Sequence, residues 1–337
     1  MRKFKSVFPF RASLLALAFV FLSISAIAQK ALRLESVGFT VNDIDRNVEF
    51  FHKAFGCSRI SDETFYGDDY EHLQGVFNLN IRVARLALGD QEIRLTEYLT
   101  PQGKPMPLEM KSNDLIFQHM AIVVSDMDKA YDKLRAMGVK QVSNVPQTLP
   151  DWNKAAAGIK AFYFKAPEGH ILELIWFPKG KGDPKWQDNP KGRLFMGIDH
   201  TAIAVSSTNR SLGFYRDILG MKIRGESKNY GAEQEHLNGV KGCEVKITGL
   251  GPTEGGMGVE FLEFLKPGSG EEFPYDSRPY DVWNWQTVIV VDNIDQIYRR
   301  VRSYPKRMVS EGMVSILGKK MFIIRDPDGH AVVIKEK

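Results

Sequence analysis

The chain has 337 residues, with 45 basic and 41 acidic side chains, a formal net charge of +4 and two cysteines. Four of the basic residues and none of the acidic ones lie in the first 28 positions, so the remainder is balanced at 41 of each sign. That balance argues against a nucleic-acid partner, and two cysteines cannot supply a cysteine-based zinc site.

The N-terminal segment has the pattern of a secretory signal. Basic residues precede an apolar run over residues 13–24, and small residues lead up to Ala28. The run is shorter than the ~20 apolar residues that span a bilayer. We therefore predict cleavage after Ala28, a periplasmic or secreted mature protein, and no membrane attachment after cleavage.

The rest of the chain repeats itself. Glu71–Val76 recurs as Glu235–Val240, and Pro167–His170 recurs as Pro327–His330, each about 160 residues further on. This spacing indicates a duplicated unit. We predict a first unit over 29–177, a Pro-, Gly- and Lys-rich linker over 178–194, and a second unit over 195–337.

Each unit contains a shorter pattern twice. An apolar strand runs into an Asp- or Ser-rich turn, a helix with apolar residues at helical spacing follows, and alternating strands come next. The expected helix starts are at 42–45, 125–128, 206–209 and 292–295. The chain is thus expected to form four modules of one strand, one helix and three strands. The two cysteines, Cys57 and Cys243, are expected to be buried free thiols.

Three segments show a family resemblance. Ile198–Val205 as an opening strand, Ser211–Gly220 as a helix, and Asp326–His330 before a last strand resemble the vicinal oxygen chelate superfamily, the group of glyoxalase I, extradiol dioxygenases and bleomycin-resistance proteins. The resemblance implies an α+β fold in which four βαβββ modules form two half-open mixed-sheet barrels.

The resemblance also implies metal-binding positions on the first and last strand of each module. The first-strand positions map to Ser36, His119, His200 and Trp285, and the last-strand positions map to Glu97, Glu173, Glu263 and Val333. Only the second and third modules hold both a histidine and a glutamate. Imidazole beside carboxylate suits a divalent ion such as Zn, Ni, Fe or Mn.

Module pairing decides which residues meet, and two arrangements are open. Pairing of the second module with the third would gather His119, Glu173, His200 and Glu263, and the resulting split into one full and one empty set of ligands favours this arrangement. Pairing within each unit would leave Glu97, His119 and Glu173 as a three-ligand fallback, and the duplication itself favours that arrangement.

We expect a metal-dependent enzyme of the glyoxalase, isomerase or lyase type, with Glu173 and Glu263 as ligands that also move protons on a small oxygenated substrate. The alternatives are an extradiol dioxygenase-like oxygenase and a non-catalytic small-molecule-binding protein. Glutathione is a cytosolic thiol, so an exported protein is not expected to be lactoylglutathione lyase itself. The chain is expected to be a monomer or a homodimer.

Overall fold

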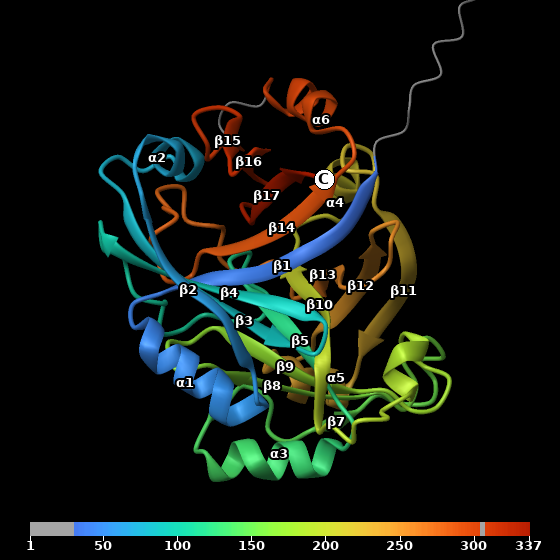
Figure 1. The fold of residues 1–337 in the computed structure, drawn as a ribbon. Coiled ribbons are helices and arrows are strands. Elements are labelled where there is room, and N and C mark those ends of the chain that lie inside the picture. The colour runs from blue at the N-terminus through green and yellow to red at the C-terminus, as the bar shows by residue number, and fades with distance from the viewer. Residues whose placement is uncertain (1–29, 304–306) are drawn as a thin grey trace, which may run out of the picture.

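The computed structural model describes residues 30–303 and 307–337 (Figure 1). The predicted signal segment therefore lies outside the described residues. None of the helices in the described part of the chain is both long enough and apolar enough to cross a membrane.

The four predicted modules are present in chain order. The first unit contains β1 (Ala31–Val41), α1 (Ile44–Phe55), β2 (Ser58–Tyr66), α2 (Asp68–Gln74), β3 (Asn80–Leu88) and β4 (Gln91–Thr100), then β5 (Gln118–Val124), α3 (Met127–Ala136), β6 (Lys140–Gln141), β7 (Gln147–Thr148), β8 (Lys160–Lys165) and β9 (Ile171–Trp176). A short 3₁₀ helix, η1 (Pro184–Gln187), lies in the linker.

The second unit repeats this order with one strand fewer in its second module. It contains β10 (Phe195–Ala204), α4 (Thr208–Tyr215), β11 (Lys222–Tyr230), α5 (Ala232–Asn238), β12 (Glu244–Gly251) and β13 (Gly258–Lys266), then β14 (Trp285–Val291), α6 (Ile294–Val301), β15 (Val314–Ile316), β16 (Lys319–Arg325) and β17 (Ala331–Glu336).

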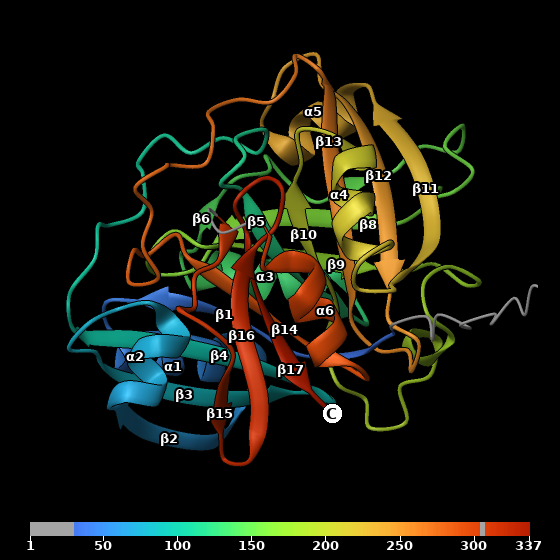
Figure 2. The ribbon, with the colours of Figure 1, turned by 90° about the horizontal axis from the view of Figure 1, so that it is seen from above.

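The modules pair across the two units rather than within them. The second and third modules form one sheet, ordered β11-β12-β13-β10-β5-β9-β8-β6, which we call the inner sheet. The first and fourth form the outer sheet, ordered β15-β16-β17-β14-β1-β4-β3-β2 (Figure 2). Both sheets mix parallel and antiparallel neighbours, and the predicted α+β fold is confirmed. Of the two arrangements that the sequence left open, this is the pairing that brings His119 and His200 into one sheet.

The helix starts follow the predicted capping residues. The side chains of Asp43, Asp126, Ser207 and Asn293 each accept a hydrogen bond from the backbone N–H three residues further on. Gly56 ends α1 in the left-handed conformation, at a φ of 73°, which glycine adopts without steric cost.

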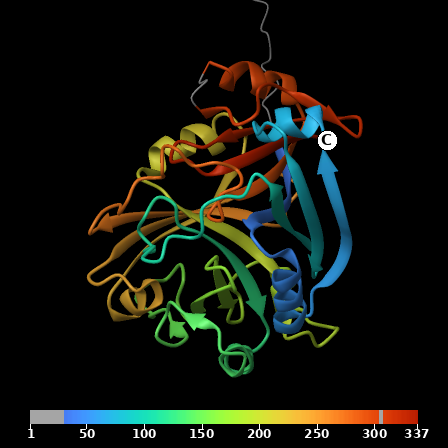
Figure 3. The same cartoon turned by 90° about the vertical axis from the view of Figure 1, so that its left-hand side faces the viewer.

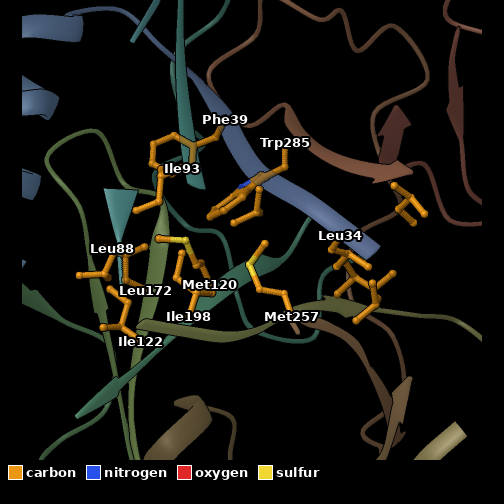
Figure 4. Packing of buried hydrophobic residues seen from close by; sticks show 14 of the residues in the cluster. Leu34, Phe39, Leu88, Ile93, Met120, Ile122, Leu172, Ile198, Met257 and Trp285 are labelled. Atoms are coloured by element: carbon orange, nitrogen blue, oxygen red, sulfur yellow. The ribbon is translucent and has the colours of Figure 1, made fainter. Parts of the chain in front are cut away.

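One face of each sheet packs into a shared core. Phe39 and Trp285 from the outer sheet meet Met120 and Ile198 from the inner sheet, and all four side chains are buried (Figure 4). The four longer helices add their apolar faces to the same core. This packing fixes the two sheets relative to each other and leaves the opposite face of each sheet for cavities.

The short helices cover those opposite faces. Leu73 of α2 packs against Val333 and Ile323 of the outer sheet, and α2 lies beside β15 (Figure 3). Leu237 of α5 packs against Leu262 and other residues of the inner sheet in the same way. Both helices belong to the repeated Glu-His-Leu segment, whose histidines are exposed.

The two cysteines are buried free thiols, as the sequence predicted. Burial raises the pKa of Cys57 to about 12 and that of Cys243 to about 11, so both stay protonated at neutral pH.

Candidate metal centre

The site starts from two neighbouring antiparallel strands at the middle of the inner sheet. In β5 and β10, His119 lies opposite Ala202 and His200 lies opposite Ala121. The two imidazole rings point to the same face, with their centroids 5.7 Å apart. The small alanine side chains opposite them are buried with the two imidazoles.

Glu173 enters from the flanking parallel strand. In β9 it lies beside Ala121, and its Oε2 is 3.0 Å from Nε2 of His119 and 3.5 Å from Nε2 of His200. One ligand atom from each of these three residues falls within 4.8 Å of the others, and all three residues are buried. The structure therefore brings together three of the four residues that the sequence singled out.

The fourth predicted residue, Glu263, is not among them. Its Oε2 accepts a hydrogen bond from the backbone N–H of Thr208, at the start of α4 on the opposite face of the sheet. In the first module the Glu97 carboxylate likewise accepts a hydrogen bond from the backbone N–H of Ile44, at the start of α1. Both glutamates stabilise helix N-termini, where backbone N–H groups lack partners inside the helix.

Glu260 takes the place expected for Glu263. It lies beside Ala202 on β13, as Glu173 lies beside Ala121 on β9, and its Oε2 is 2.9 Å from Nε2 of His200. A three-residue step along a strand reverses the face, which is why one glutamate points to the histidines and the other to the helix. The two glutamates stand in one strand, and only the alternation of its faces distinguishes them.

The fourth module needs a similar correction. Trp285 lies opposite Phe39 and is buried in the shared core. In the β1–β14 pair, Gln286 lies opposite Gly38. In the β5–β10 pair, His119 lies opposite Ala202 at the same place in the register, so Gln286 is the counterpart of His119. In the outer sheet, the positions of His200, Glu260, His119 and Glu173 are thus occupied by Ser36, Arg94, Gln286 and Val333, respectively.

A further carboxylate orients His200. Oδ2 of Asp199 is 2.9 Å from Nδ1 of His200, and Oδ1 accepts a 2.6 Å hydrogen bond from the indole N–H of Trp186 in η1. Asp199 can reach its neighbour because a β-bulge falls between Ile198 and His200. Such a carboxylate fixes the tautomer and ring orientation of a metal-binding histidine.

The four side chains fit a cation. Ligand atoms held at ~2.1 Å from a common centre lie about 3.0–3.4 Å apart. The three imidazole-to-carboxylate distances, of 2.9–3.5 Å, match this spacing, and the ligand atoms of His119, Glu173 and His200 all lie within 4.8 Å of one another. Although they are this close to carboxylate oxygens, Nε2 of His119 and Nε2 of His200 are buried and make no hydrogen bond. Both nitrogens instead lie close to the Glu173 carboxylate, and the His119, Glu173 and His200 cluster can hold a divalent metal.

The charges in the site are strongly coupled. Burial alone would raise the pKa of Glu173, but the adjacent His119 and His200 imidazoles outweigh it and lower that pKa to about 2. Burial alone would lower the pKa of His200, but Glu260, Asp199 and Glu173 raise it well above its ordinary value. Glu173 is therefore ionised throughout the physiological range, as a ligand must be.

A cavity of about 470 Å³ adjoins the cluster. Asp199 and Glu260 form part of its wall, and Arg224, Glu226 and Ser227 of β11 form another part. The volume is within the usual range for small-molecule sites. Glu260 is the half-buried member of the ligand group, so it is placed to contact both a cation and a molecule in the cavity.

Comparison with known proteins agrees with this geometry. The profile of the Glyoxalase/Bleomycin resistance protein/Dioxygenase superfamily matches residues 33–174 and 197–334. The chain belongs to this superfamily. The two matched segments coincide with the two repeated units, and the family resemblance expected from the sequence is confirmed.

Individual relatives cover different parts of the chain. It is 34% identical over 157 residues to 2-epi-5-epi-valiolone epimerase of Actinomyces sp, a match that covers 44% of this chain and 82% of that protein. It is 30% identical over 117 residues to glyoxalase I of Saccharomyces cerevisiae, over 35% of this chain but 32% of that protein. The crystal structure of glyoxalase I from Zea mays shares the fold, with a TM-score of 0.60 at 18% identity over 90% of this chain and 92% of that one.

Proposed function

We propose that the protein is a metal-dependent enzyme that moves a proton at a carbon next to an oxygenated carbon of a small substrate, in an isomerisation, epimerisation or lyase reaction. The observation that carries the proposal is the convergence of His119, Glu173, His200 and Glu260 beside a cavity. The likeness to a named epimerase and to glyoxalase I supports this reaction class.

His119, Glu173, His200 and Glu260 would hold the divalent ion. When bound, such an ion polarises a substrate oxygen and makes the neighbouring C–H group more acidic. Glu260 faces the cavity and is the residue placed to take the proton from the carbon; in an isomerisation it would return that proton to the neighbouring carbon. Glu173 is fully enclosed by the two histidines, so its role is to bind the ion.

A hydrogen-exchange assay tests this function directly. We expect the purified protein to contain about one divalent metal ion per chain, measured by elemental analysis. In D₂O it should exchange the C–H hydrogens next to the carbonyl of acetoin or dihydroxyacetone, followed by NMR. His119→Ala and His200→Ala should lose both the metal and the exchange.

The alternatives have different outcomes in the same experiment. Metal without exchange would contradict the proposed reaction and favour a binding protein. Oxygen consumption with catechol would contradict it in favour of a dioxygenase. Exchange that survives loss of the metal would contradict a metal-dependent mechanism. The periplasmic or secreted location stays a prediction from residues 1–28, and so does the expectation of a substrate other than a glutathione adduct.

A further inference from the structure

The outer sheet carries a second cavity, of about 460 Å³, on the face that corresponds to the metal centre of the inner sheet. Among the described residues, the cluster with metal-ligand geometry lies in the inner sheet, so this cavity needs another explanation. Its volume is in the range of small-molecule sites. One end is lined by apolar side chains that include Phe65, Tyr70 and Ile81, and the other end is charged.

The outer sheet has basic residues at three positions that correspond to the metal centre of the inner sheet or to its immediate surroundings. Arg94 lies beside Gly38 as Glu260 lies beside Ala202, so a guanidinium stands where the inner sheet has a carboxylate. Arg85 is opposite Arg94 as Gly249 is opposite Glu260.

The third replacement is on the last strand of the sheet. Lys335 follows Val333 by two residues, as Ile175 follows Glu173, and the two strands have matching parallel registers. The outer sheet is therefore basic at three points where the inner sheet has one carboxylate, Glu260, and two uncharged residues, Gly249 and Ile175.

The added cations outnumber their partners. Arg94 donates to Oε1 of Glu35 at 2.9 Å and to Oε1 of Glu92 at 2.7 Å. Arg85 contacts both oxygens of Glu92, and Lys335 contacts both oxygens of Glu35. Glu63 and Lys319 also line the cavity. Four cations, Arg85, Arg94, Lys319 and Lys335, thus stand against the three carboxylates of Glu35, Glu63 and Glu92, which leaves one positive charge for an anion.

A buried donor without a partner also faces this cavity. Asn284 lines it and is 2% exposed, yet its Nδ2 makes no hydrogen bond among the described residues. The neighbouring Gln286 differs, because its amide donates to Gln74 at 2.8 Å. A buried donor of this kind is costly unless something accepts from it, and a ligand oxygen would do so.

We propose that the outer cavity binds a small organic monocarboxylate, with its carboxylate at Arg94 and its hydrocarbon part against the apolar end. This site is separate from the metal centre and does not depend on the reaction proposed above. Guanidinium and carboxylate form charge-assisted hydrogen bonds, and apolar contact adds affinity in proportion to the buried area.

Calorimetric titration with benzoate, phenylacetate and hexanoate tests the proposal on the full mature chain. At least one of these carboxylates should bind with one site per chain, at least tenfold more tightly than benzyl alcohol or acetate. Arg94→Gln removes the cation, and Val333→Phe fills the cavity without changing its charge. Each variant should weaken binding at least tenfold. Glu260→Gln in the inner sheet is the matched control and should leave binding unchanged, as should prior treatment with a chelator.

Four results would overturn the proposal. The first is that none of the three carboxylates binds. The second is equal affinity for benzoate and benzyl alcohol, which would remove the role of charge. The third is wild-type affinity in both Arg94→Gln and Val333→Phe. The fourth is loss of binding on chelation or in Glu260→Gln, which would place the carboxylate at the metal centre.

Discussion

Two glutamates three residues apart on β13 have different roles. Glu260 faces the histidines, whereas Glu263 accepts a hydrogen bond from the first turn of α4. A carboxylate in an apolar strand needs a partner, and a helix N-terminus satisfies it as well as a metal does. The sequence shows the need for a partner but not which of the two partners is used.

Exchange of each carboxylate for an amide separates these roles. Glu260→Gln should lower metal affinity at least tenfold with little change in stability. Glu263→Gln should keep the metal and lose about 1 kcal/mol of unfolding free energy, because the helix loses a charged acceptor at its N-terminus. Metal titration and urea unfolding measure the two quantities. The opposite pattern would restore Glu263 as the ligand.

His170 is a buried histidine outside the metal centre. Its Nε2 is 2.7 Å from the carbonyl of Val282, and its ring stacks on Phe39 at 4.0 Å. Burial lowers its pKa to about 4, from an ordinary value of 6.5. The folded protein therefore holds this side chain neutral at pH values where the unfolded chain is already protonated.

This pKa sets a direction for stability. Between the ordinary and the lowered pKa the unfolded state binds more protons, so stability falls as the pH falls through that window. His170 should contribute about 2 kcal/mol to the loss between about pH 7 and pH 5. Urea unfolding of chelator-treated protein should show a flatter pH dependence for His170→Gln. Parallel profiles for variant and wild type would contradict this assignment.

At the scale of elements, the repeated Pro-Glu/Asp-Gly-His turns join the modules within each unit. Both oxygens of Glu168 accept backbone N–H groups at the start of α1, from Asn42 and Asp43. Asp328 accepts in the same way from Ser206 before α4. The His170 contact reaches Val282, far along the chain, which local sequence patterns cannot reveal.

Helices and capping residues were predictable because they depend on short-range spacing. The face of the sheet to which each strand side chain points was less predictable. The assignment of Trp285 in place of Gln286 is an error of one residue, and one residue moves a side chain to the other face of a sheet. Bulges in β1 and β10 further disturb the alternation of side chains between the two faces, because each falls just before a candidate site position, Ser36 or His200. Three of the four residues that the sequence singled out, His119, Glu173 and His200, nevertheless lie together in the structure.

The linker helix η1 acts on the metal centre through Asp199. Trp186→Phe keeps the ring and removes the hydrogen bond to the carboxylate that orients His200. Metal affinity should fall about tenfold, the lower end of the usual effect of such supporting groups. Trp283→Phe is the matched control, because it removes an indole hydrogen bond to Ser277 away from the inner sheet. Equal affinities in the two variants would show that Trp186 does not position the site.

At the scale of the whole molecule, neither unit holds a complete site. His119 and Glu173 come from the first unit, while His200 and Glu260 come from the second, across the β5–β10 pairing. The fragments 29–177 and 195–337 should each fail to retain metal when produced alone. Co-expression should restore about one ion per pair, measured by elemental analysis after size-exclusion chromatography. Metal retention by 29–177 alone would contradict this and point back to Glu97.

The crossed pairing of modules has the form of a twofold-symmetric dimer whose two subunits have become one chain. In a homodimer, one substitution alters both equivalent sites at once, because a single gene encodes them. Fusion of the two copies removes that constraint. One sheet can keep its histidines and glutamates while the same positions in the other sheet become Ser36, Arg94, Gln286 and Val333. One chain can therefore carry different residues, and with them different chemistry, at two sites that a homodimer would have to keep identical.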